Sequence, residues 1–121
     1  SVPVNIAGRL VEVSIPSAFD LVNNHPNPFN PSTSISYDVP QQAPITLVVY
    51  NVLGQKVVRL VDEFKQPGRY IAIWQGRNLN GIGVSSGVYF YRLSTSTGFV
   101  KSKRMTLLKK AYDEFGERVI A

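Results

Sequence analysis

Apolar and polar residues alternate with a period of two through most of this chain. From Thr33 to Val39, every second residue falls on one face of an extended segment, and Ser34, Ser36 and Asp38 fall on the other. A strand has this period, whereas an amphipathic helix repeats every 3.6 residues. The pattern therefore predicts β-strands and almost no helix. Strand-like runs occur at residues 9–14, 19–22, 33–39, 45–50, 56–61, 70–74, 88–93 and 99–108.

Turn-forming residues separate these runs. Leu53-Gly54 and Thr97-Gly98 each join two adjacent runs, which predicts two hairpins. About seven short strands at this spacing predict an all-β fold, an antiparallel β-sandwich. The expected core residues are Ile35, Tyr37, Leu47, Val49, Val58, Leu60, Trp74, Tyr89, Tyr91 and Leu93.

Composition narrows the function classes. The chain has 121 residues, 44% of them hydrophobic, which is enough for the core of one domain. It has no cysteine and a single histidine, His25, which excludes disulfides, thiolate zinc sites, cysteine nucleophiles and multi-histidine metal sites. Asp62 and Glu63 are adjacent, so in a strand they face opposite sides and form no catalytic pair. No apolar run approaches the roughly 18–20 residues of a transmembrane helix. We therefore predict a protein that is not an enzyme, with no cofactor, no metal site and no membrane insertion.

Residues 26–31, Pro-Asn-Pro-Phe-Asn-Pro, are the least strand-like stretch. Each proline fixes its own φ and pushes the preceding residue toward extended geometry. We expect a stiff proline ribbon (residues 26–31) that cannot pair along its length and whose only large anchor is Phe29, packed on the sandwich edge. A rigid entry loop is the favoured interpretation, and a proline-rich ligand for a partner domain is the alternative.

Positive charge is concentrated near the end of the chain. The net charge is +5, and five Lys and Arg residues fall within residues 101–110 with no acid among them. Such a cluster is explained by charges that protect an edge strand from pairing. The more specific alternative is a binding site for an anionic partner. Nucleic-acid binding would need exposed aromatic residues interleaved with these cations, and only Phe99 shares a face with Lys101 and Lys103. We expect no nucleic-acid partner.

Several motifs, in order, resemble one known family. They are His25-Pro-Asn-Pro-Phe-Asn-Pro-Ser-Thr, Ile35-Ser-Tyr, Val49-Tyr-Asn-Val-Leu-Gly-Gln-Lys-Val, Gly68-Arg-Tyr, Trp74-Gln-Gly-Arg-Asn, Ser86-Gly-Val-Tyr-Phe-Tyr-Arg-Leu and Lys103-Arg-Met-Thr-Leu-Leu-Lys. Together they resemble the type A C-terminal sorting domain of the type IX secretion system, and the related immunoglobulin-like domain of the flagellar hook-capping protein. The resemblance covers about residues 19–110.

The resemblance implies an immunoglobulin-like sandwich of about seven strands at the end of a larger secreted protein. It also implies recognition by the outer-membrane secretion machinery and, in some members, cleavage by a surface sortase and attachment of the cargo to lipopolysaccharide. The implied location is the cell surface or the medium, reached through the periplasm. Carried over residue by residue, the expected partner-recognition residues are Pro26, Asn27, Pro28, Phe29, Asn30, Pro31, Gly87, Val88, Tyr89, Lys101, Lys103, Arg104 and Lys109.

The resemblance divides the chain into three parts. Residues 19–110 are the expected sorting-type domain, residues 1–18 a linker or an extra N-terminal strand, and residues 111–121 a C-terminal tail with at most one helical turn at 111–119. Family members usually end close to the closing lysine, so we expect residues 111–121 to reduce export if the signal must be terminal.

Three functions follow from these observations. The first is a sorting module that directs an upstream cargo domain across the outer membrane. The second is a structural immunoglobulin-like module of an extracellular assembly, a homo-oligomer joined by exchanged terminal strands. The third is an ancillary carbohydrate-binding module of a secreted enzyme, which would require a row of exposed aromatic residues on one sheet.

Overall fold

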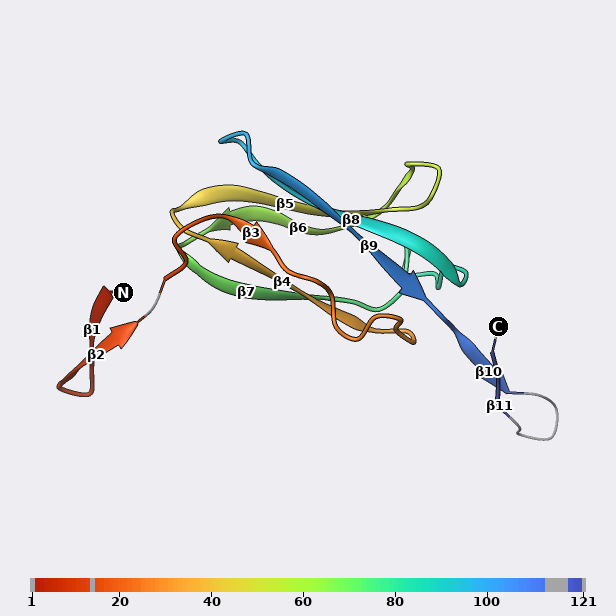
Figure 1. The fold of residues 1–121 in the computed structure, drawn as a ribbon, viewed down its shortest axis with the longest axis horizontal. Coiled ribbons are helices and arrows are strands. Elements are labelled where there is room, and N and C mark those ends of the chain that lie inside the picture. Colours follow the sequence, from red (N-terminus) through yellow and green to blue (C-terminus); the bar gives the residue numbers. More distant parts are fainter. Residues whose placement is uncertain (1, 14, 113–117, 121) are drawn as a thin grey trace.

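Two antiparallel sheets packed face to face form the centre of the molecule (Figure 1). The structure, a computed structural model, describes residues 2–13, 15–112 and 118–120, and the side chains of residues 7–8 and 15–109. One sheet has the order β3-β4-β7 and the other the order β6-β5-β8-β9. Their strands are β3 (Asp20–Leu21), β4 (Thr33–Val39), β5 (Ala43–Tyr50), β6 (Lys56–Lys65), β7 (Gly68–Trp74), β8 (Gly87–Thr95) and β9 (Val100–Leu107). The predicted immunoglobulin-like β-sandwich is confirmed.

Both predicted hairpins are present. Residues 51–55 join β5 to β6, and residues 96–99 join β8 to β9. In the first, the Asn51 carboxamide oxygen accepts hydrogen bonds from the backbone N–H groups of Leu53 and Gln55 at 2.9 and 3.0 Å. Gly54 has φ 77°, a left-handed conformation that costs glycine little.

The chain ends form two small sheets of their own. β1 (Val2–Ile6) pairs with β2 (Arg9–Val13), and β10 (Lys110–Tyr112) pairs with β11 (Arg118–Ile120). In Figure 1 the two hairpins lie beyond opposite ends of the sandwich. The helical turn expected at 111–119 is wrong for residues 111–112 and 118–119, which are strand, and residues 113–117 lie outside the described residues.

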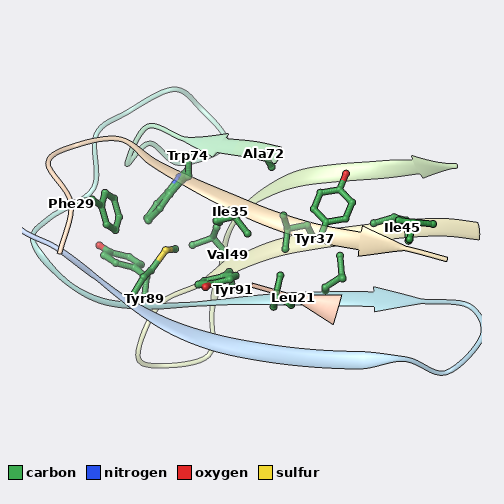
Figure 2. Close-up of a cluster of buried hydrophobic side chains, with 14 of the residues drawn as sticks. Leu21, Phe29, Ile35, Tyr37, Ile45, Val49, Ala72, Trp74, Tyr89 and Tyr91 are labelled. Carbon is green, nitrogen blue, oxygen red and sulfur yellow. The ribbon is translucent and has the colours of Figure 1, made fainter. Parts of the chain in front are cut away.

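Side chains from both sheets meet in one apolar core (Figure 2). The alternation of residues 33–39 sends Ile35, Tyr37 and Val39 inward with at most 1% of their surface exposed. The core prediction is wrong for Val58 and Leu60, which are only partly buried. They lie on β6, an edge strand whose pairing with β5 shifts register twice, so its side chains do not all face inward.

Candidate functional site

The proline ribbon is fastened to the end of β9. Phe29 donates its backbone N–H to the Thr106 carbonyl at 3.0 Å, and the Leu108 N–H donates to the Phe29 carbonyl at 2.9 Å. The Thr106 N–H donates to the Asn27 carboxamide oxygen at 3.0 Å. The expectation that the ribbon does not pair along its length therefore needs a correction at Phe29, whose N–H and carbonyl bond to Thr106 and Leu108 at the end of β9. The flanking Pro28 has no backbone N–H, so it donates nothing to β9.

An aromatic cluster anchors the ribbon from inside. Phe29 is 2% exposed, and its ring centroid lies 5.6 Å from that of Trp74, which lies 5.1 Å edge-on from that of Tyr89. These rings join the ribbon, the end of β7 and the start of β8 (Figure 2). The predicted anchor role of Phe29 and the predicted burial of Trp74 and Tyr89 are confirmed.

Gly76, two residues after β7, lets the chain pass close to the ribbon. Its φ is 70°, and a Cβ there would lie 3.2 Å from the Pro31 carbonyl oxygen and 3.4 Å from Leu107 Cδ2. Only glycine combines this conformation with this approach at low cost. The Trp74-Gln-Gly motif thus forms part of the surface on which the ribbon packs.

The Gly87-Val88-Tyr89 motif lies mostly inside the fold. Tyr89 is 6% exposed, and its hydroxyl donates to the Ser85 carbonyl at 2.7 Å, four residues upstream. A tyrosine near the start of a strand that bonds back in this way is a corner found in immunoglobulin-like sandwiches. Gly87 and Val88 are half-buried. Tyr89 therefore lies within the fold, where it supports the positions of the ribbon and of β8.

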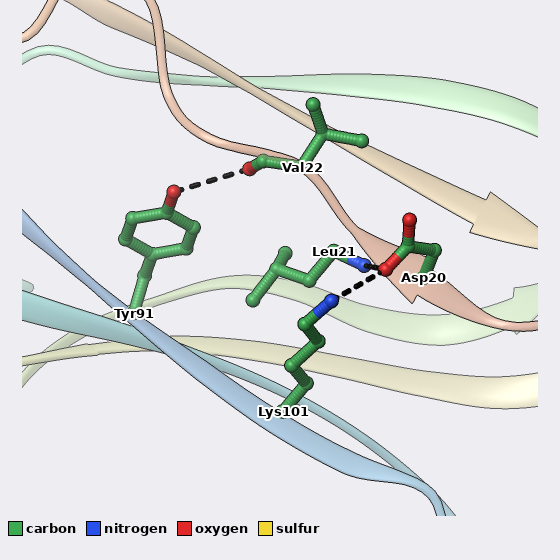
Figure 3. A network of polar contacts seen from close by, with 5 residues as sticks. All are labelled: Asp20, Leu21, Val22, Tyr91 and Lys101. Atoms are coloured by element: carbon green, nitrogen blue, oxygen red, sulfur yellow. Dashed lines mark hydrogen bonds and ion pairs between the residues drawn. The ribbon is translucent and has the colours of Figure 1, made fainter.

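The basic residues of β9 divide between its two faces, as the alternation predicts. Lys101 and Lys103 point to the side of Met105, and Arg104 points outward and is exposed. Lys101 Nζ lies 2.7 Å from Asp20 Oδ1 on β3, so it ties the edges of the two sheets together (Figure 3). The hydrogen bond from Lys101 is the main reason that the pKa of Asp20 is lowered, and the Leu21 N–H adds to it. Beside this pair, Phe19 and Phe99 pack with ring centroids 5.5 Å apart.

Tyr91 makes a second cross-link between the sheets. Its hydroxyl donates to the Val22 carbonyl at 3.1 Å (Figure 3). The same hydroxyl accepts a hydrogen bond from the Asn24 N–H at 2.9 Å. Burial raises the pKa of this hydroxyl. The segment that leads into the ribbon is thus held on β8 as well as on β9.

Lys109 lies against another loop. Its backbone N–H donates to Ser86 Oγ at 2.9 Å, and its ammonium group lies so near Gly83 that a Cβ there would be 2.8 Å from Nζ. The structure therefore brings the ribbon and the end of β9 together, places Tyr89 beneath them, and sets Lys109 against residues 83–86.

One edge of β9 remains open. Both backbone groups of Thr106 point away from β8, because they bond to the ribbon. Since these groups alternate along a strand, those of Ser102 and Arg104 point the same way. Within the described part of the chain, no backbone hydrogen bond reaches them. The open edge of β9 is therefore a row of unpaired N–H and C=O groups beside Lys103 and Arg104.

Sequence reasoning missed a hollow at the loop end of the sandwich. The turn after β5 and the loop after β7 flank a space of about 480 Å³ lined by amide side chains, Lys56 and Leu79. Leu53 is 78% exposed and Leu79 80%, and the Leu79 N–H donates to the Val57 carbonyl at 3.2 Å. The motif that begins at Val49 supplies Asn51, Gln55 and Lys56, and the motif that begins at Trp74 ends at Asn78, just before Leu79.

The described residues hold no group of three or more His, Cys, Asp or Glu side chains placed to bind a metal ion. Among them there is also no helix long and apolar enough to cross a membrane.

Comparisons with known proteins agree with this architecture. Residues 23–107 match the profile of the family described as "Secretion system C-terminal sorting domain". Among solved structures, the chain is similar to dimeric latent PorU from Porphyromonas gingivalis, with 20% identity and a TM-score of 0.60 over 84% of this chain and 10% of that chain. It is also similar to PorZ of the same organism, described as an essential bacterial surface component of the type IX secretion system, with 18% identity and a TM-score of 0.51 over 77% of this chain and 12% of that chain. At these identities both likenesses concern the fold, and the chain spans only about a tenth of each protein. No curated protein matches the chain.

Proposed function

The chain belongs to the family of secretion system C-terminal sorting domains, and we propose that it directs a larger cargo protein from the periplasm across the outer membrane to the cell surface or medium. The family match covers the sandwich from the ribbon through β9. We further propose that the domain performs this role by binding, without catalysing a reaction on its cargo.

The observation that carries this proposal is the joining of the ribbon to the open edge of β9. Unpaired backbone groups at Ser102 and Arg104 suit the addition of an extended strand from a partner. The cations at Lys103 and Arg104 select an acidic segment, and within the described residues neither forms an ion pair. The ribbon closes one end of this edge and so fixes where the added strand must stop.

Within this proposal the predicted recognition residues have unequal roles. Lys103, Arg104 and the exposed ribbon residues contact the partner directly. Phe29 and Tyr89 are buried and act by holding the ribbon in position. Lys101 contributes to the fold through Asp20 as well as to the positive potential.

The two other functions have weaker support. Terminal strand exchange needs unpaired terminal strands, and here β1 and β10 pair within their own hairpins. Carbohydrate binding needs a row of aromatic rings. On the outer face of the larger sheet, Phe64 lies opposite Pro44 and Phe90 opposite Tyr50, about 20 Å apart along β5.

The test is export of a periplasm-directed reporter fused to the full chain, in a host with a type IX system. We expect the wild-type fusion to reach the surface or medium and Lys103→Gln/Arg104→Gln to be retained. The matched control is Lys56→Gln/Arg59→Gln, which removes two cations from β6, the other edge of the same sheet. Circular dichroism of each purified domain checks that it is folded.

Retention of both the wild-type fusion and a fusion that ends at Lys110, each with a folded domain, would overturn the sorting proposal. Equal loss of export in both double variants would show that net charge matters and that the edge of β9 does not.

A further inference from the structure

The sandwich has four edge strands, and three of them carry features that discourage pairing with a second copy of this chain. β3 is only two residues long. β6 is charged and its register with β5 shifts twice. β9 carries Lys101, Lys103 and Arg104, and the ribbon pairs with its end. Short length, charge, bulges and covering segments are the usual protections of a sheet edge.

The fourth edge, β7, has none of these protections. Its seven residues pair with β4 without a register shift, it contains no proline, and its one charged residue is Arg69. Ile71 is 67% exposed and Ile73 53% exposed. In Figure 1 this strand borders its sheet with no further strand beside it.

Backbone geometry shows which groups of β7 are free. On β4, Ser34 exchanges hydrogen bonds with His25 and the Ser36 carbonyl accepts from Val22, so these residues point toward β3. Their neighbours Ile35 and Tyr37 therefore bond to their partners on β7, Ala72 and Tyr70.

It follows that Arg69, Ile71 and Ile73 point their N–H and C=O groups away from the sheet. In the described part of the chain these groups have no backbone partner.

We propose that β7 is a self-association edge, on which the β7 of a second copy of this chain adds in antiparallel orientation with Ile71 opposite Ile71. This proposal is independent of the sorting function. It joins two three-stranded sheets into one continuous six-stranded sheet around a two-fold axis.

Self-complementarity is the reason to assign a second copy as the occupant. Ile71 is the midpoint of β7 and its backbone points outward, so a two-fold axis beside it pairs Arg69 with Ile73 of the partner subunit at both ends. All three pairs are then hydrogen-bonded, and the isoleucines of both copies form one apolar patch on the same face.

Charge does not oppose this register. The two Arg69 side chains lie four residues apart along the paired strands, about 14 Å, and each keeps its own Asp38 at 3.8 Å. The net charge of +5 on each copy resists association at long range, so we expect added salt to tighten the dimer.

The absence of native cysteine allows the register to be tested directly. In a hydrogen-bonded antiparallel pair the Cα atoms are about 5.5 Å apart, within the range of a disulfide. We expect Ile71→Cys in the full chain to form a disulfide dimer under mild oxidation. Ile73→Cys alone should form no intermolecular disulfide, because its copies lie about 14 Å apart in the dimer. An equimolar mixture of Ile73→Cys and Arg69→Cys should give the mixed dimer.

Phe64→Cys is the matched control for random collision, because Phe64 is 65% exposed on the bulged edge strand β6. A second experiment measures the wild-type chain and Ile71→Lys by sedimentation velocity across concentrations. Two lysines directly opposite each other repel, so the dissociation constant should rise about tenfold or more, whereas Phe64→Lys should leave it unchanged.

A wild-type chain that stays monomeric at millimolar concentration would overturn the proposal. So would equal cross-linking of Ile71→Cys and Phe64→Cys, or a dimer that survives Ile71→Lys.

Discussion

β7 and β9 are both edge strands of one sandwich, and they differ in almost every property of their open sides. β9 is basic, is covered at one end by the ribbon and is tied to the opposite sheet through Asp20. β7 has one charged residue and two exposed isoleucines. An approaching strand that would suit one edge is thus poorly matched to the other, since β9 selects acidic residues and β7 selects apolar ones.

The difference shows how one small fold can offer two separate backbone surfaces. Each edge belongs to a different sheet, so occupation of one leaves the hydrogen bonds of the other unchanged. The two edges are nevertheless connected through the core, because Trp74 ends β7 and touches Phe29 in the ribbon that covers β9.

Trp74→Ala should have the largest effect on the free energy of unfolding, and it should destabilise the β7 and β9 edges together. Loss of a buried tryptophan, 2% exposed here, lowers the free energy of unfolding by about 3–5 kcal/mol, and the hydrogen bond from its indole N–H to the Arg77 carbonyl is also lost. Urea denaturation measures the change. Ile73→Ala, one residue earlier on the exposed face, should cost less than about 1 kcal/mol. Similar costs for the two variants would contradict the assignment of Trp74 as the link between the edges.

Gly76→Ala should have an intermediate effect on the free energy of unfolding, and the structural change should be confined to the ribbon and the end of β9. An alanine with positive φ costs about 1–2 kcal/mol, and at Gly76 the contact with the Pro31 carbonyl adds to that cost. Gly54→Ala is the control, because Gly54 has φ 77° and nothing within 4 Å of its missing Cβ. The excess cost of Gly76→Ala over Gly54→Ala therefore reports the contact with the ribbon.

Hydrogen exchange locates the same change. The amides of Thr106 and Leu108, which donate to the ribbon, should exchange faster in Gly76→Ala, while the amides between β4 and β7 keep their protection. Unchanged protection at Thr106 would show that the ribbon does not depend on Gly76.

Asp20→Asn should have the smallest effect and should depend on pH. The pKa of Asp20 is lowered in the folded chain, chiefly by the hydrogen bond from Lys101. The pair therefore stabilises the fold above the unfolded pKa of about 4, and this contribution is lost as the pH falls through the folded pKa. Both side chains are nearly half exposed, so solvent screens the pair to below about 1 kcal/mol.

The measurement compares the free energy of unfolding of wild type and Asp20→Asn at pH 7 and pH 2. The difference between them should be larger at pH 7 than at pH 2, and 1 M salt should reduce it at pH 7. A difference that is constant with pH would mean that the ion pair does not stabilise the β9 edge.

Local patterns in the sequence were enough to predict the strands, the hairpins and most of the core. Period-two alternation assigns each side chain of residues 33–39 and 99–107 to a face, and turn residues set the hairpins, because both depend on neighbours along the chain. The ordered motifs also determined the family, since they require no knowledge of contacts.

Which edges are open, and which segments meet at them, became visible only in the folded chain. Asp20 and Lys101 are 81 residues apart in the sequence, and Asn27 and Thr106 are 79 apart. Alternation predicted that Ile71 and Lys103 lie on strands, but the order of strands in each sheet decides whether a strand has one neighbour or two. That order depends on packing between residues distant in the chain, and a local pattern carries no information about it.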